Sequence, residues 1–259
     1  MGKYDSSKTR VVPVFDRLLE KDPTGWLPQL LALPVGGNPV HATEDNRLNI
    51  ENYGWGRNER KLSPPVSLLS WLIRHPRAPV SGGLSADPEK AAVRQEWING
   101  SVERIREGLA LLRHNPENLD WHIFEGETQP DVYIETQDMI VVIEGKRTEH
   151  GPTTKTKWMA GRHQMLRHID CAWEIRGRKT IAGFFIVEGS DPSSVEVDEQ
   201  WQTFARETTA ASAVSASLPH RSPEEQAQIA ACFAGVTTWQ RVCNEFGLDA
   251  TALPDECDG

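Results

Sequence analysis

An apolar run that ends abruptly in an acid and a base constrains this chain most. Residues Met139–Ile143 are continuously apolar and rich in β-branched side chains, which predicts a strand covered on both faces. Glu144 and Lys146 follow at alternate positions, so in a strand their side chains share one face. Burying two such charges costs free energy unless they pair with each other or bind a metal.

A second carboxylate precedes this run. Residues 131–134 alternate as a strand does and begin with Asp131. Asp131 and Glu144 can supply carboxylate oxygens, and Gly145 a backbone carbonyl, which are the ligands of a hard divalent cation. Such a cation would activate water and polarise a phosphoryl oxygen, and Lys146 would orient or deprotonate that water or stabilise the developing charge. The alternative is a hairpin with a solvated Glu–Lys pair and a turn aspartate.

Pro130-Asp131 followed by Glu144-Gly145-Lys146 resembles the motif of the PD-(D/E)XK nuclease superfamily. The resemblance covers roughly residues 88–188 and implies a restriction-endonuclease-like α/β fold, in which helices flank a mixed central sheet. It also implies cleavage of nucleic-acid phosphodiester bonds with Mg²⁺, for which Mn²⁺ is expected to substitute. By position, Asp131 and Glu144 correspond to the metal ligands and Lys146 to the catalytic lysine.

A helix is predicted to follow the lysine, from Thr156 to about Arg176. Its period places four apolar side chains in one stripe, namely Trp158, Met165, Ile169 and Ala172. Gln164 and His168 lie together at one edge of the stripe. A glutamine on this helix is a recurrent feature of the family, so Gln164 is expected in the catalytic site and His168 beside it. The alternative is that both residues simply border the core. Arg162 points at phosphate or snorkels past the core.

Further acids in the metal site are an open question. Some family members add a glutamate from the first helix, but Glu96, Glu103 and Glu107 fall opposite the apolar stripe here, and none is assigned that role. Glu125 and Glu127 flank the turn before the motif, either as additional acids or as ordinary turn charges.

The predicted elements divide the chain into three regions. Residues 1–86 read as a mainly helical and irregular N-terminal region, with irregular structure over 34–62. Residues 87–190 form the nuclease-like core: a long helix over 87–113, strands over 121–124 and at the motif, the helix over 156–176 and a strand over 179–188. Residues 191–259 are predicted as a helical C-terminal extension packed on the core, with helices over 222–233 and 236–246.

The distribution of charge along the chain indicates the class of molecule that it binds. The net charge is −9, yet the segment 146–179 holds nine basic residues and three acids. This local excess predicts contacts with a nucleic-acid backbone, for which Arg162, Arg167 and His168 are the candidate substrate-binding residues. DNA is favoured over RNA.

Apolar stretches, the start of the chain and the cysteines indicate the cellular compartment. There is no apolar stretch of membrane-spanning length, the start MGKYDSSKTR is too polar for a signal peptide, and the four cysteines are scattered. These features predict a cytoplasmic protein with no membrane partner, and a homo-oligomer is left open. The alternatives to a nuclease are a catalytically silent nucleic-acid-binding module and a structural module on the same fold. Another metal hydrolase would be expected to show closely spaced histidines, and the eight histidines show no such spacing.

Overall fold

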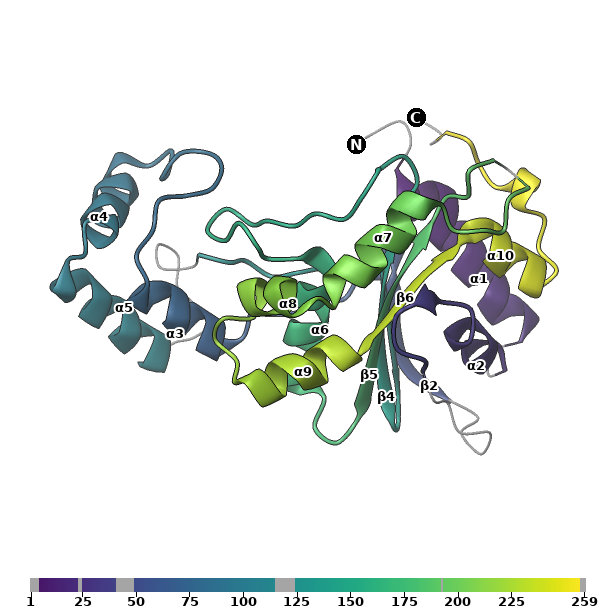
Figure 1. Ribbon diagram of the computed structural model, residues 1–259, viewed down its shortest axis with the longest axis horizontal. Coiled ribbons are helices and arrows are strands. Elements are labelled where there is room, and N and C mark those ends of the chain that lie inside the picture. The colour runs from purple at the N-terminus through teal and green to yellow at the C-terminus, as the bar shows by residue number, and fades with distance from the viewer. Residues whose placement is uncertain (1–4, 23–24, 41–48, 115–123, 192, 257–259) are drawn as a thin grey trace.

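A six-stranded mixed sheet forms the centre of the computed structural model, which describes residues 5–22, 25–40, 49–114, 124–191 and 193–256. The strand order is β1-β6-β5-β4-β3-β2 (Figure 1). The strands are β1 (Val35–Gly36), β2 (Ile50–Trp55), β3 (Val132–Thr136), β4 (Met139–Gly145), β5 (Thr180–Val187) and β6 (Phe233–Thr238). β4, β5 and β6 run parallel, whereas the other neighbouring pairs are antiparallel. The predicted α/β class, with helices flanking a mixed sheet, is confirmed.

One face of the sheet is covered by helices from the two ends of the chain. They are the short helical turn η1 (Ser7–Val11), α1 (Val12–Lys21), α2 (Trp26–Leu31) and α10 (Trp239–Glu245). A 3-10 turn, η3 (Ala250–Ala252), follows α10. Alternate strand residues such as Val141, Ile143 and Phe184 are fully buried in this core. The alternation of the side chains thus assigns odd-numbered β4 positions to this face.

The opposite face of the sheet carries the helices that follow the lysine motif. They are α6 (Gln164–Ile175), α7 (Glu199–Thr208), α8 (Ala211–Ser217) and α9 (Pro223–Ala231). Ile140, Val142 and Phe185 point toward these helices and are buried against residues such as Met165 and Ile169 of α6. Even-numbered β4 positions, which include Glu144, therefore face α6.

Three further helices pack together apart from the sheet. They are α3 (Val66–Arg74), α4 (Pro88–Ile98) and α5 (Val102–His114), and in Figure 1 they lie at the opposite end of the molecule from α1 and α10. Their small core includes Leu68, Leu72 and Leu112, closed by the stacked rings of Trp97 and Phe124. Trp97 also donates a hydrogen bond from Nε1 to the Ile73 carbonyl (2.9 Å).

Two predicted helices differ from the observed ones. The helix predicted over 87–113 is divided into α4 and α5 near Gly100, whose positive φ of 81° is incompatible with a continuous right-handed helix. The helix predicted over 156–176 begins only at Gln164. Trp158 therefore lies on the preceding loop, where it packs edge-on against Trp97 and Phe124 instead of extending the α6 stripe.

Three strands of the sheet lie outside the predicted core region. β1 and β2 occur within residues 34–62, which were predicted to be irregular, and the predicted helix over 236–246 starts at Trp239 because residues 233–238 form β6. The strands predicted at the motif and over 179–188 are confirmed. Most of the strand predicted over 121–124 lies outside the described residues. Among the helices of the described part, none is both long and apolar enough to cross a membrane.

Candidate active site

The pairing of β3 with β4 brings the two predicted carboxylates together. Val132 pairs with Ile143, so Asp131 and Glu144 follow directly at the adjoining ends of the two paired strands. The Gly145 N–H donates a hydrogen bond to Asp131 Oδ2 (2.8 Å), which fixes the aspartate beside the end of β4.

Gly145 has a packing reason to be glycine. A Cβ atom at this position would lie 2.8 Å from Cζ2 of Trp239 and 2.9 Å from Cγ2 of Val11. The same indole donates a hydrogen bond from Nε1 to the Lys146 carbonyl (3.1 Å), and the Lys146 N–H donates to the Ile186 carbonyl (2.8 Å). The backbone between the acid and the lysine is therefore clamped on the α10 face, while both side chains project to the α6 face.

Glu144 is the centre of the site. Its Oε1 accepts hydrogen bonds from Lys146 Nζ (2.9 Å) and Gln164 Nε2 (2.6 Å), and its Oε2 lies 3.0 Å from His168 Nε2. Gln164 is the first residue of α6 and His168 lies one turn later, so the α6 N-terminal turn sits over the carboxylate. Three residues singled out from the sequence thus meet around the carboxylate of a fourth, Glu144.

Both α6 side chains are themselves held in place. His168 Nδ1 lies 2.9 Å from Thr128 Oγ1, and the Thr128 backbone is bridged to Leu62 by two hydrogen bonds. The Gln164 side-chain carbonyl accepts from the Thr153 N–H (3.4 Å), which orients its NH₂ group toward Glu144. These contacts orient the donors to Glu144 in the manner of the outer partners that fix residues of a metal site.

The ionisable groups of the site have pKa values that depart from their ordinary ones. Burial, followed by the negative charges of Glu144 and Glu59, raises the pKa of Asp131 to about 8. Burial also opposes ionisation of Glu144, but its contacts with His168 and Lys146 outweigh this and hold its pKa below the ordinary value. Burial disfavours the Lys146 ammonium, yet the ion pair with Glu144 keeps the lysine pKa above the ordinary value. In this arrangement Lys146 is therefore an ammonium that donates to Glu144.

Glu59 is a third carboxylate that the sequence did not reveal. It follows the 3-10 turn η2 (Gly56–Asn58) and accepts a hydrogen bond from Ser7 Oγ (3.3 Å). Burial and the charges of Glu144 and Asp5 raise the pKa of Glu59, although the Ser7 hydroxyl opposes them. Glu59 is distant from the motif in sequence, and only the pairing of β2 with β3 places it near Asp131.

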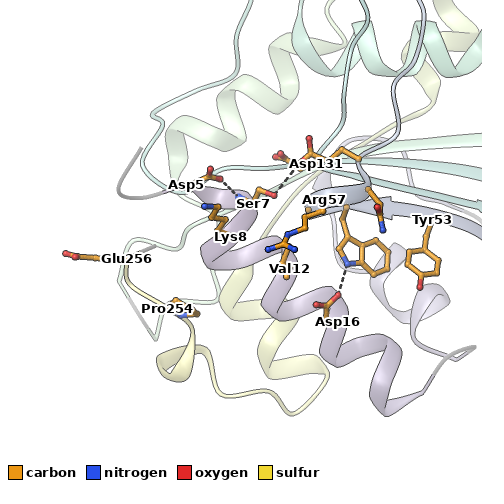
Figure 2. Close-up of a pocket in the computed structure, with 14 residues that line it drawn as sticks. Asp5, Ser7, Lys8, Val12, Asp16, Tyr53, Arg57, Asp131, Pro254 and Glu256 are labelled. Atoms are coloured by element: carbon orange, nitrogen blue, oxygen red, sulfur yellow. Dashed lines mark hydrogen bonds between the residues drawn. The ribbon is translucent and has the colours of Figure 1, made fainter. Parts of the chain in front are cut away.

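Two hollows flank the carboxylate pair. The larger one, the acidic hollow, has a volume of about 1260 Å³ (Figure 2). Asp131 lies in its wall with four other acids, Asp5, Asp16, Glu59 and Glu256, and two basic residues, Lys8 and Arg57. The smaller one, the basic hollow, has a volume of about 300 Å³, and two residues of its lining contact Glu144. It is lined by Gln164 and His168 together with Thr128, Lys155, Thr156 and Arg167.

The donor set suits one hard cation held by few protein ligands. Within the described ranges, no group of three or more His, Cys, Asp or Glu side chains is arranged to hold a metal ion. Mg²⁺, however, is commonly bound through one or two carboxylates and keeps several waters. Three of the roughly four lone-pair sites of Glu144 face protein donors, which leaves it room for one more contact beside Asp131. A divalent cation would offset the repulsion among the buried carboxylates around Asp131.

Arg162, predicted as a phosphate contact or a snorkelling residue, occupies neither position. Its side chain is 0% exposed and its guanidinium binds Glu125 and Asp170 at 2.9 and 2.8 Å. Arg162 Nη1 also donates a hydrogen bond to the Ser217 carbonyl (2.9 Å). Arg162 is thus a buried structural cation that precedes α6, and its donors face protein acceptors. Glu125 likewise pairs with Arg162 and is not part of the candidate site.

The basic segment predicted to face a nucleic-acid backbone is divided between internal and exposed roles. Lys179 pairs with Glu51 and Glu135 at the far end of β5. Arg167 is 22% exposed, donates to the carbonyls of Gly126 and Glu127, and lines the basic hollow. The charge available beside the site is therefore smaller than the sequence excess suggests.

No family model, curated protein or solved structure matches this chain.

Proposed function

We propose that this chain is a Mg²⁺-dependent nuclease of the PD-(D/E)XK type, which hydrolyses phosphodiester bonds of nucleic acid, with DNA favoured over RNA. The observation that carries the proposal is the convergence of Lys146, Gln164 and His168 on Glu144, beside Asp131. A purely structural Glu–Lys pair does not require a second carboxylate at the adjacent position, where it costs free energy.

Each residue of the site has a distinct role in this proposal. Asp131, Glu144 and the Gly145 carbonyl would hold Mg²⁺, or Mn²⁺ in its place. The cation, when bound, supplies charge stabilisation for the phosphoryl oxygens and lowers the pKa of a bound water. Lys146, as an ammonium, donates to the charge that develops on the phosphoryl group or orients the attacking water.

The two α6 residues position the carboxylate rather than react. Gln164 fixes Glu144 Oε1 through its amide, and His168 fixes Oε2 through Nε2. Because both are themselves held by Thr153 and Thr128, the carboxylate is preorganised before substrate binds. Arg167 and His168 remain candidates for contact with substrate at the basic hollow.

The test is cleavage of end-labelled single- and double-stranded DNA and RNA in Mg²⁺, Mn²⁺ or EDTA. We expect cleavage with either cation and none with EDTA. Lys146→Ala should lower the rate by about 100-fold or more while Mg²⁺ affinity is retained, and Gln164→Ala should cost about tenfold. Lys179→Ala, which removes a lysine paired with Glu135 away from the site, is the matched control. If none of the four substrates is cut with either cation, the proposal is wrong.

A catalytically silent module is the second candidate, and one observation favours it. Glu144 is already compensated by Lys146 in an ion pair at 2.9 Å, so the fold needs no cation to neutralise it. Calorimetric titration with Mg²⁺ and Mn²⁺ separates the two candidates. The nuclease requires binding that Asp131→Asn and Glu144→Gln each abolish, whereas the silent module requires none.

A further inference from the structure

Two side chains connect the basic hollow to Glu144. Gln164 and His168 each contact the Glu144 carboxylate, and both also line the hollow. A group bound there would therefore lie next to the candidate site without occupying it. Its volume of about 300 Å³ suits a small group rather than a whole nucleotide chain.

The charge of this hollow is opposite to that of the acidic hollow. Lys155 is exposed and Arg167 is partly exposed at its wall, and the one acid in the lining, Glu127, is 51% exposed and lies 3.6 Å from Lys61. The acidic hollow instead holds five acids against two basic residues. A polyanion is therefore attracted to the basic hollow and repelled by the acidic hollow.

Two buried polar atoms at the basic hollow lack hydrogen-bond partners. Thr156 Oγ1 is buried and has none among the described residues. Arg167 Nε lies 3.3 Å from Glu125 Oε1, but the contact does not have the geometry of a hydrogen bond. Buried donors without partners are uncommon, and a small rotation of either side chain toward the hollow would let a bound acceptor group satisfy it.

We propose that the basic hollow binds a backbone phosphate of the substrate, the one next to the phosphate that is cut. The inference rests on the proposed nuclease function. Lys155 and Arg167 supply positive charge and Thr156 a hydroxyl donor, while Gln164 and His168 connect this phosphate to Glu144. The substrate strand then passes over the N-terminal turn of α6 and leaves the acidic hollow on its other side.

The first experiment needs no catalysis. Inorganic phosphate is titrated into the full chain and the amide resonances are followed by NMR. The shifts should be centred on residues 153–168, and Lys155→Gln should weaken binding about tenfold, the effect of losing one charge-assisted contact. Lys8→Gln removes an exposed lysine of the acidic hollow and should leave the affinity unchanged. Equal binding by Lys155→Gln, or shifts centred on Lys8 and Arg57, would overturn the inference.

The second experiment separates the inference from the function on which it rests. With an oligonucleotide, Lys155→Gln should raise KM about tenfold with little change in kcat and should reduce the salt dependence of binding by about one released counterion. Cleavage with unaltered KM and salt dependence in this variant rejects the phosphate site but keeps the nuclease. Phosphate binding without cleavage by the wild-type protein rejects the nuclease but keeps the hollow as a phosphate site.

Discussion

Asp131 is the residue at which the site is electrostatically least favourable. Its carboxylate is largely buried and lies near two other carboxylates, Glu144 and Glu59. An asparagine would keep an acceptor for the Gly145 N–H and would remove the ionisable carboxyl whose pKa is raised to about 8. Replacing Asp131 should therefore stabilise the metal-free folded protein and abolish the binding of a metal ion.

We predict that Asp131→Asn raises the free energy of unfolding of the metal-free protein by about 1–3 kcal/mol at pH 7.5, because the unfolded wild-type chain ionises this carboxyl freely whereas the folded protein must keep it protonated or bury its charge. The increase in Tm that Mg²⁺ gives the wild-type protein should be lost. Thermal unfolding with Mg²⁺ or EDTA measures both effects. Asp138→Asn, in the exposed turn between β3 and β4, is the control and should change neither. A destabilised variant that still responds to Mg²⁺ would contradict the assignment.

His163, the residue that precedes α6, gives a prediction on pH. Burial, followed by the nearby His168, lowers the pKa of His163 to about 4, whereas an unfolded histidine titrates near 6.5. Between these values the unfolded chain binds more protons, so the free energy of unfolding decreases as pH falls from about 6.5 to about 4. The full loss is on the order of 3 kcal/mol.

Urea unfolding over this pH range should show that loss in the wild-type protein and a flatter profile in His163→Gln. The amide can still contact Thr208 Oγ1, which lies 3.1 Å from His163 Nε2. His150→Gln replaces an exposed histidine and should retain the wild-type pH dependence. If the two variants behave alike, His163 does not cause the acid sensitivity.

At the scale of elements, one buried guanidinium joins α6 to its surroundings. Arg162 connects Glu125, on the segment before β3, to Asp170 of α6 and to the last residue of α8, Ser217. Asp170 is also contacted by Arg221. Burial alone would raise the pKa of Asp170, but the contacts with Arg162, His220 and Arg221 outweigh burial and hold this pKa well below its usual range.

Arg162→Met should lower the free energy of unfolding by about 3–5 kcal/mol, because it leaves two buried carboxylates without their common partner. Arg178→Met, at an exposed position after α6, should change it by less than about 0.5 kcal/mol. Chemical unfolding measures both. An Arg162→Met protein of normal stability that binds nucleic acid weakly would restore the sequence-based interpretation of a phosphate contact.

The difference between predicted and observed elements has physical causes. β4 and β5 were predictable because long β-branched runs bury both faces, whereas β6 is a short run in which Gly235, Thr237 and Thr238 weaken any period. Gln164 and His168 could be predicted as neighbours because their spacing is local to one helix. Glu59 could not, because its position near Asp131 depends on the long-range pairing of β2 with β3.

At the scale of the whole molecule, the predicted core of residues 87–190 contains three of the six strands, β3, β4 and β5. Its sheet would lose β6 from one side and β2 from the other, and the face formed by Val141, Ile143 and Phe184 would lose α1, α2 and α10. We therefore predict that a chain of residues 87–190 does not fold cooperatively.

Circular dichroism through a thermal ramp, with NMR dispersion of the amide signals, tests this prediction. The full chain, measured in parallel, should melt in one sharp transition. A sharp transition and dispersed signals from residues 87–190 alone would show that the flanking regions are additions to an independent domain.

Both edges of the sheet come from one short stretch of chain, since β1 and β2 lie within residues 35–55 while the strands between them come later. During synthesis on the ribosome, β1 emerges early, yet its hydrogen-bonding partner β6 is among the last elements translated. Until then, β5 has an unpaired backbone edge that can recruit another nascent chain. Strands that are neighbours in the sheet are thus translated far apart in time. Slowing elongation after β5 should therefore increase aggregation rather than aid folding.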